Sequence, residues 1–237
     1  SAHASVSVDS YEHGVNGGGS PKDIETILQL MYLNFTDPRF DETDLQNLKN
    51  MYVPYFRNME ADPGYLMGKA FTETLYQNHV RRQATSAAQI ESLNLETLAS
   101  VHKQLFSYAD DFRFVIAGNV DLNTLKPLVE KYIGSLPTSK KVEYAVVDDG
   151  VRTATGKVTN DFRVAMQQPK VSVYLTFSGA IEDNAKNRLV LDLLTRALDS
   201  RYMVSIREEK GGTYGVHVQG GINEYPVEQY MAVIVFD

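Results

Sequence analysis

The side chains that most often perform chemistry in proteins are scarce in this sequence. Of its 237 residues, five are histidine and none is cysteine. The absence of cysteine excludes disulfides, thiolate zinc sites, iron–sulfur clusters and cysteine nucleophiles. The histidines form neither His-Glu-x-x-His nor the inverted His-x-x-Glu-His, the pairings with which zinc peptidases hold their metal. We therefore predict that this chain contains no metal site.

Two weaker patterns involve glycine and basic residues. Gly17–Gly19 precede a helix start and could hold an anion, but the Gly-Lys-Ser/Thr of a phosphate loop is missing, which favours a turn. His79 with Arg81 and Arg82 could form a basic patch, although a solvated loop after a helix is the favoured interpretation. His102 lies on an amphipathic helix and is interpreted as a structural histidine.

The elements that would position a site begin with a strand and a series of helices. Residues 4–11 alternate in polarity and predict a strand, residues 14–19 a glycine-rich turn, and residues 112–117 a buried strand. Ser20 suits the cap position of the first helix. Capping residues and apolar spacing predict helices over 20–31, 41–56, 62–76, 94–105 and 121–134. We expect a kink, or a break near Val53, in the second of these because Pro54 lies inside it.

A change in composition divides the chain into two parts. Residues 139–157 are rich in linker residues and separate 1–138 from 158–237. The second part predicts a helix over 183–198 with a further helical stretch to 209, and strands over 162–165, 171–177, 214–219 and 229–236. We interpret the chain as the rear part of one α+β repeat joined to the front part of the next. It ends directly after a strand, where a domain seldom ends unless it has been truncated.

A more specific pattern occupies Leu198–Val216. It contains Ser200-Arg201-Tyr202 and then Arg207-Glu208-x-x-Gly211-x-x-Tyr214 before a predicted strand. The pattern resembles the pitrilysin, insulysin and mitochondrial-processing-peptidase family of inverted zinc peptidases. Further segments that resemble the family extend the likeness over nearly the whole chain: 30–41, 62–63, 112–119 and 125–137.

The resemblance implies an α+β fold, a mainly antiparallel sheet packed with helices, in proteins of four homologous domains. The first of these domains carries the zinc motif, and the last carries an Arg and a Tyr seven residues apart that point at the bound peptide. Arg207 and Tyr214 have this spacing and become the candidate catalytic residues. Gly211, Gly212 and His217 are candidate substrate contacts. Zinc would be bound in the full-length enzyme but not by this chain, which lacks the zinc half.

The chemistry of Arg207 and Tyr214 suits the polarisation of a peptide carbonyl. A guanidinium is always charged and has five donors, and a tyrosine hydroxyl can donate one hydrogen bond. Preorganised donors aimed at an oxygen on which negative charge grows are worth roughly 3 kcal/mol each. Gly211 and Gly212 would let a substrate backbone come close, and residues 214–219 could pair with an extended peptide. The plain alternatives are a helix C-terminal cation for Arg207 and a half-buried strand aromatic for Tyr214.

Composition narrows the possible partners. With 43% hydrophobic and 22% charged residues the chain is globular in character. Its net charge of −7 argues against nucleic acid, because binding to phosphates needs a positive field. No apolar run approaches the roughly 18 residues of a membrane-spanning helix. The family resemblance favours a periplasmic or other extracytoplasmic location.

Two functions follow from these patterns. In the first, the chain is part of a zinc metalloendopeptidase that cuts peptides or unfolded proteins. It supplies substrate binding and carbonyl polarisation, while the zinc-bearing half belongs to the same polypeptide or to a partner subunit. The isolated chain would then be inactive. In the second, the chain is a non-catalytic peptide-binding or scaffold subunit of the same family. The pairing of Arg207 with Tyr214 favours the first, because a scaffold has no need of it.

Overall fold

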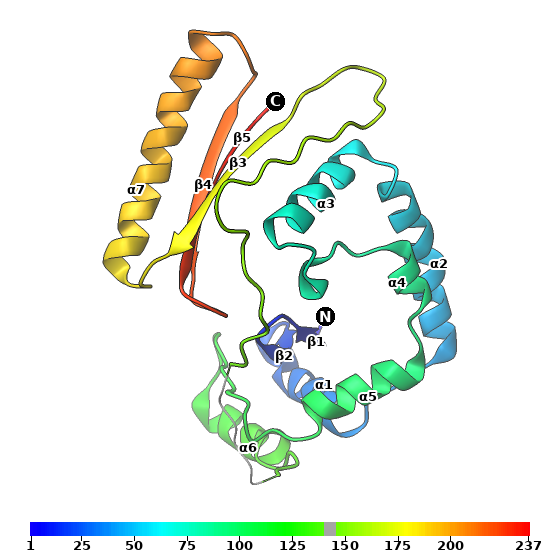
Figure 1. The fold of residues 1–237 in the computed structure, drawn as a ribbon. Helices are drawn as coiled ribbons and strands as arrows, with labels where there is room; N and C mark the ends of the chain where they lie inside the picture. Colours follow the sequence, from blue (N-terminus) through cyan, green and yellow to red (C-terminus); the bar gives the residue numbers. More distant parts are fainter. Residues whose placement is uncertain (140–145) are drawn as a thin grey trace. The chain divides into compact units, whose positions relative to one another are not determined.

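The computed structural model describes residues 1–139 and 146–237 (Figure 1). The chain forms two compact units. The first comprises Ser1–Phe56 and the described part of Ser86–Ala145, and the second comprises Arg57–Thr85 and Val146–Asp237. Helices and antiparallel strands occur in both, which confirms the α+β class. The boundaries predicted from composition, 1–138, 139–157 and 158–237, stay a prediction, and residues 140–145 of the linker lie outside the described residues.

The first unit opens with a hairpin on which a helix packs. Strands β1 (His3–Val8) and β2 (His13–Gly18) pair antiparallel and are followed by α1 (Ile24–Thr36). The prediction of a glycine-rich turn over 14–19 is therefore wrong, because most of these residues belong to β2. Their small size serves packing: a Cβ on Gly17 would lie 2.8 Å from Cγ2 of Ile27 on α1. Glycine at this position lets the helix approach the strand closely.

Aromatic side chains form the core of the first unit. Phe35 of α1, Phe106 of α5 (Leu95–Phe106) and Leu136 are buried together. Phe112 and Phe114 pack against this cluster, with ring centroids of Phe35 and Phe112 4.9 Å apart. The predicted strand over 112–117 is wrong, since no ladder is formed there. These residues contribute side chains to the core without backbone pairing.

Capping residues fix most helix starts, as the sequence predicts. Asp62, Asn94 and Asp121 each accept a hydrogen bond from the backbone N–H three residues later. They begin three helices: α3 (Pro63–Leu75), α5 and α6 (Leu122–Tyr132).

Two helix predictions need correction. The Ser20 side chain makes no capping bond, and a short 3₁₀ turn, η1 (Pro21–Asp23), precedes α1. Helix α2 (Glu42–Met59) continues through Pro54, so the break near Val53 is wrong, and the alternative of a kink stays a prediction. A proline removes one intrahelical hydrogen bond, but the other backbone hydrogen bonds of this long helix are enough to keep it continuous. Short segments complete the helical part: η2 (Val80–Arg82) and α4 (Ala87–Glu91).

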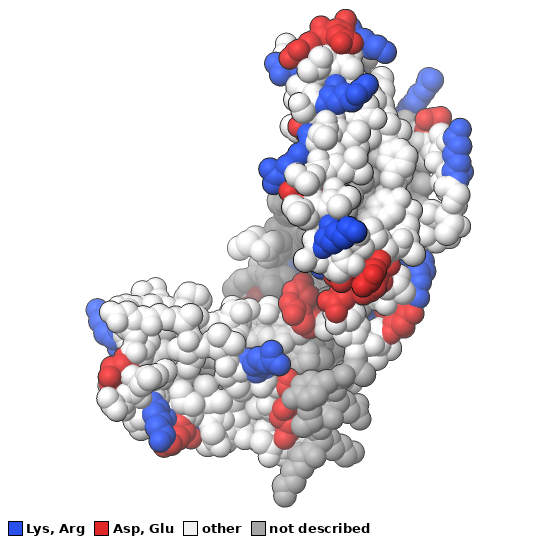
Figure 2. Space-filling view, turned by 90° about the vertical axis from the view of Figure 1, so that its left-hand side faces the viewer, with Lys and Arg blue, Asp and Glu red and all other residues white. Residues whose placement is uncertain are grey.

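The second unit is a three-stranded antiparallel sheet with a helix on one face. Strands β3 (Val173–Ala180), β5 (Gln229–Phe236) and β4 (Val216–Asn223) lie in that order. Helix α7 (Ala185–Tyr202) packs against β4, and Figure 2 looks onto its outer side. The strand over 229–236 is confirmed, and the strands predicted over 171–177 and 214–219 are shifted by two residues toward the C-terminus at their starts. The predicted strand over 162–165 is wrong, because no ladder forms there.

The other face of this sheet meets α3 and residues 151–155. The rings of Phe71 on α3 and Tyr174 on β3 lie 5.1 Å apart. The Ser178 hydroxyl donates to Thr153 Oγ1 at 3.1 Å, and the Ala154 N–H donates to the Leu75 carbonyl at 2.7 Å. These contacts attach the chain segment before β3 to both the sheet and the helix.

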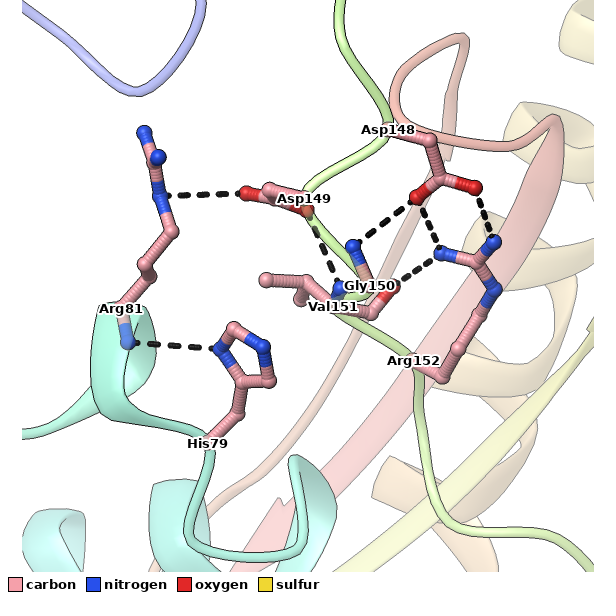
Figure 3. A network of polar contacts seen from close by, with 7 residues as sticks. All are labelled: His79, Arg81, Asp148, Asp149, Gly150, Val151 and Arg152. Atoms are coloured by element: carbon pink, nitrogen blue, oxygen red, sulfur yellow. Dashed lines mark hydrogen bonds and ion pairs between the residues drawn. The ribbon is translucent and has the colours of Figure 1, made fainter.

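A polar network joins η2 to the loop formed by residues 148–152 (Figure 3). Arg81 pairs with Asp149 at 3.2 Å, and Arg152 binds Asp148 through two guanidinium nitrogens at 2.9 and 2.5 Å. His79 accepts a hydrogen bond from the Arg81 N–H through Nδ1. The Arg152 guanidinium and the Gly150 N–H together lower the pKa of Asp148 to about 2. His79 thus caps η2, and Arg81 connects η2 to the loop that contains Asp149.

Candidate functional site

The candidate site lies where α7 passes into β4. The helix does not stop at Tyr202 but widens into a π-helical turn, Met203–Glu208, which confirms the predicted helical stretch toward 209. The Glu209 N–H donates to the Val204 carbonyl at 3.0 Å, five residues back. Single π turns often occur at functional sites, because they change the direction in which side chains project. Arg207 belongs to this turn.

Gly211 and Gly212 end the turn. The Gly211 N–H donates to the Arg207 carbonyl, and the Gly212 N–H donates to the Ile206 carbonyl, each at 3.1 Å. Gly211 has a φ of +57°, in the left-handed region where a Cβ is strained. A Cβ on Gly211 would meet no atom within 4 Å, so glycine is required here by the backbone conformation and not by crowding.

Arg207 and Tyr214 are both exposed. Tyr214 is 98% exposed and lies two residues before β4. The Arg207 guanidinium makes a weak contact from Nη1 to the Met203 sulfur at 3.6 Å. Within residues 1–139 and 146–237 no hydrogen bond or ring contact joins the two side chains. The structure therefore brings the pair to one turn without bringing them into contact.

His217 lies on β4 opposite Val235 and is exposed. Neighbouring residues on a strand point to opposite faces, so its side chain lies on the face away from buried Val216. The loop before it is ordered by Thr213, whose hydroxyl accepts from the Gly215 N–H at 3.2 Å and donates to the Gly215 carbonyl at 2.9 Å. The roles assigned to Arg207, Tyr214, Gly211, Gly212 and His217 stay predictions.

Sequence reasoning missed Asp199, which holds the helix against the strand. Its carboxylate accepts a hydrogen bond from the Val218 N–H at 2.9 Å. Because β4 is an edge strand, this N–H points away from β5 and would otherwise be free to pair with another chain. Asp199 thus occupies one of the groups that pairing of residues 214–219 with an extended peptide would need. Asp199 is half-buried on an otherwise exposed helix flank, and its role depends on this tertiary contact.

A large cavity lies elsewhere in the second unit. It has a volume of about 1830 Å³ and lies between α3, the segment before β3, and β3 itself. None of the five predicted site residues lines it. Apolar side chains on its walls include Met67, Phe71, Phe162, Met166 and Tyr174. The predicted site residues and this cavity therefore lie in different places of the second unit.

Neither zinc binding nor membrane crossing finds support in the described residues. Among them, no group of three or more His, Cys, Asp or Glu side chains lies close enough together to hold a metal ion. The donor set of the described chain therefore does not fit a zinc site. No helix in the described ranges has the length and apolar content needed to cross a bilayer.

Comparison with known proteins decides the family. The family model of the peptidase M16 inactive domain matches residues 92–236, more than half of the chain and including the whole predicted site. The chain belongs to this family. The resemblance stated from residues 198–216 is thereby confirmed, and so is the description of the chain as a protease-family, zinc-metallopeptidase-related domain.

Relatives of this M16 inactive-domain chain are much longer. The probable zinc protease PqqL of Haemophilus influenzae is 20% identical over 89% of the chain, and that of Escherichia coli is 25% identical over 91%. The chain spans only 22% and 23% of these proteins, about a quarter of their length.

Solved structures share the fold. The periplasmic protease PqqL of Escherichia coli has a TM-score of 0.78 at 22% identity, covering 99% of this chain and 26% of its own. The ferredoxin protease FusC, solved in complex with Arabidopsis ferredoxin, has a TM-score of 0.69 at 15% identity, covering 99% and 25%. At these identities the likeness establishes the fold alone.

Proposed function

We propose that this M16 inactive-domain chain is the part of a zinc metalloendopeptidase that binds the substrate and polarises its scissile carbonyl. The names of the PqqL relatives support a zinc protease as the whole protein. The metal would be held outside this chain, because the described residues do not fit a zinc site. The isolated chain is accordingly inactive.

The observation that carries the proposal is the exposure of Tyr214. A tyrosine kept for packing buries most of its ring, whereas this one is 98% exposed, two residues before a strand. Arg207 is exposed as well, and its one described contact is to a methionine sulfur. Two strong donors that do no packing are available to a ligand.

In the proposed role, a peptide carbonyl binds between the two side chains. Arg207 and Tyr214 would each donate to the carbonyl oxygen as negative charge develops on it during hydrolysis. Gly211 has open space where a Cβ would stand, so a substrate backbone can come close to the turn. His217, exposed on β4, would contact the peptide further along.

The substrate class and the location follow the relatives. We assign a peptide or unfolded protein as substrate, and the zinc-bearing half of the same polypeptide or of a partner subunit as the complement of this chain. The solved E. coli relative is a periplasmic protease, which favours a periplasmic or other extracytoplasmic location. A non-catalytic peptide-binding or scaffold subunit is the second candidate, because the matched family is that of the inactive domain.

The test is the Tyr214→Phe variant in the full-length protein or reassembled enzyme. The change removes one hydroxyl from an exposed ring, so folding is kept while one oxyanion donor is lost. We expect kcat for a quenched peptide to fall about 10²-fold with an unchanged melting temperature. Tyr108→Phe, which alters another exposed tyrosine, is the matched control and should retain full activity.

Arg207 variants separate the enzyme from the scaffold. Arg207→Ala should lower kcat and raise KM, and Arg207→Lys should restore little, because an ammonium does not reproduce the planar fork. Arg196→Ala, which removes a cation paired with Asp192 on α7, is the control. Near-normal kcat in both Tyr214→Phe and Arg207→Ala would refute the polarising role and leave the scaffold function.

A further inference from the structure

Helix α7 and strand β4 lie side by side and are in contact at two levels (Figure 1). At the first level, a Cβ on Gly220 would lie 3.0 Å from the Thr195 methyl group, so helix and strand are packed closely there. At the second level, the Asp199 carboxylate accepts a hydrogen bond from the Val218 N–H at 2.9 Å. From the first level to the second, the helix advances by four residues and the strand goes back by two.

These two contacts define a register of the helix against the strand. Four helical residues rise about 6 Å and two strand residues rise about 6.6 Å, so the steps along the two elements match. The same step, taken once past Asp199, leads to Met203 on the helix side and Val216 on the strand side. Taken twice, it leads to Arg207 in the π turn and to Tyr214, two residues before β4. The π turn contacts β4, as this register requires.

On the helix side, a series of contacts connects Asp199 to the guanidinium of Arg207. The Asp199 backbone carbonyl accepts a hydrogen bond from the N–H of Met203, the first residue of the π turn. The Met203 sulfur in turn lies 3.6 Å from Nη1 of Arg207. Asp199 therefore links three parts of the second unit: the edge strand through its side chain, the last turn of α7, and the turn that contains Arg207.

The other polar contacts of this segment are local. The Gly211 and Gly212 N–H groups donate back to the π turn, and Thr213 bonds with Gly215. Among the residues that the structure describes, no second hydrogen bond joins residues 185–208 to residues 213–223. Without the Asp199 carboxylate, side-chain packing alone would hold α7 and the π turn against β4.

We propose that Asp199 is a positioning residue for Arg207 and Tyr214, because its hydrogen bond to Val218 holds the π turn in register with the start of β4. The expected effect on catalysis rests on the proposed function, whereas the effect on the turn is measurable without activity. The carboxylate acts here as a hydrogen-bond acceptor, so an amide oxygen in its place serves as well. An alanine leaves the Val218 N–H without its partner and detaches the turn.

Hydrogen exchange of the 237-residue chain tests the attachment. Asp199→Ala should speed exchange of the Val218, Gly211 and Gly212 amides at least about tenfold, because local opening becomes easier. Asp199→Asn should leave these rates near those of the wild type. Asp192→Ala, which removes an ion-paired carboxylate from the same helix, is the matched control and should change none of them.

Two outcomes of the exchange experiment would overturn the proposal. Unchanged exchange of the Gly211 and Gly212 amides in Asp199→Ala would show that the turn does not depend on this bond. An equal loss of protection throughout β5 would show that Asp199 serves the stability of the whole unit and not the placement of the turn.

Kinetics of the full-length enzyme test the link to the pair. Asp199→Ala should lower kcat about tenfold, because a small misplacement of a donor is costly, and Asp199→Asn should restore most of it. In a Tyr214→Phe background, the same Asp199→Ala change should cost no more than about threefold, since one group that Asp199 positions is already lost.

The kinetic outcomes separate this proposal from the proposed function. Wild-type kcat in Asp199→Ala, or an equal loss in both backgrounds, would overturn the positioning role. Full activity of Tyr214→Phe by itself would instead refute the polarisation of the carbonyl. Hydrogen exchange would then still decide whether Asp199 holds the turn.

Discussion

The polar side chains of interest are of two kinds: some are exposed to solvent, and others make contacts within the protein. Tyr214 and Arg207 are exposed, whereas the Asp199 carboxylate accepts a hydrogen bond from the backbone N–H of Val218. His102 is the internal case: its ring packs against Phe40 and Phe106. Burial lowers the pKa of His102, and a hydrogen bond with the Asn34 backbone offsets part of that effect.

The lowered pKa of His102 predicts a pH dependence of stability. The fold favours the neutral ring, so the unfolded chain binds the proton more strongly and stability is lost as the pH falls below about 6.5. His102→Phe keeps an aromatic ring and removes the titration. We expect the free energy of unfolding of the variant, measured by urea denaturation between pH 7 and pH 5, to decrease less steeply than that of the wild type. The difference cannot exceed about 1.4 kcal/mol per pH unit, and identical slopes would contradict the assignment.

At the scale of elements, both units use glycine to bring a helix onto a strand. Gly17 of β2 makes room for Ile27 of α1, and Gly220 of β4 makes room for Thr195 of α7. The contact at Gly220 is tight on two sides, because a Cβ there would also lie 2.9 Å from the Met231 carbonyl oxygen. Neither glycine has a positive φ, so close packing and not backbone conformation explains them.

Alanine at two adjacent glycines tests this packing. Gly220→Ala should lower the free energy of unfolding by about 1–3 kcal/mol, because backbone and helix must move apart. Gly221→Ala, the next residue on the same strand, adds a Cβ with nothing within 4 Å and should be nearly neutral. Thermal unfolding of both variants measures the difference. A similar fall in melting temperature for both would point to a general effect of strand glycines.

At the scale of the whole molecule, the chain is a pair of compact units that lacks a metal cluster in its described residues. It belongs to the M16 inactive-domain family and spans 22% and 23% of the PqqL relatives, and the substrate-binding role beside a zinc-bearing half is our proposal. Arg207 on the π turn and Tyr214 before β4 both lie in the second unit.

Metal content tests the role at this scale. We expect the 237-residue chain, purified without chelators, to bind no stoichiometric zinc and to cleave no peptide, because its histidines and acids lack a ligand arrangement. Inductively coupled plasma mass spectrometry measures the zinc, and a quenched peptide reports cleavage. One zinc per chain, lost when residues of this segment are changed, would show that the chain itself holds the metal. It would refute the proposal that zinc is bound outside this chain.

Much of the local structure was predictable because its causes are local. Asp62, Asn94 and Asp121 cap the helices that follow them. Each capping hydrogen bond joins a side chain to the backbone N–H three residues later, so it needs no tertiary partner. The strand over 229–236 is apolar enough to be read from its own residues. Arg207 and Tyr214 became candidates through the resemblance of residues 198–216 to a known family, and a motif of this kind lies within one short stretch of sequence.

The tertiary structure decided what depends on distant neighbours. Residues 14–18 form a strand because β1 pairs with them and α1 needs their small size, whereas residues 112–117 and 162–165 have strand-like patterns but no ladder. The exposure of Tyr214 and the separation of the predicted pair from the cavity beside α3 also depend on which elements come together. Hydrogen-bond ladders and burial are properties of pairs of segments, and a linear pattern specifies only one member of each pair.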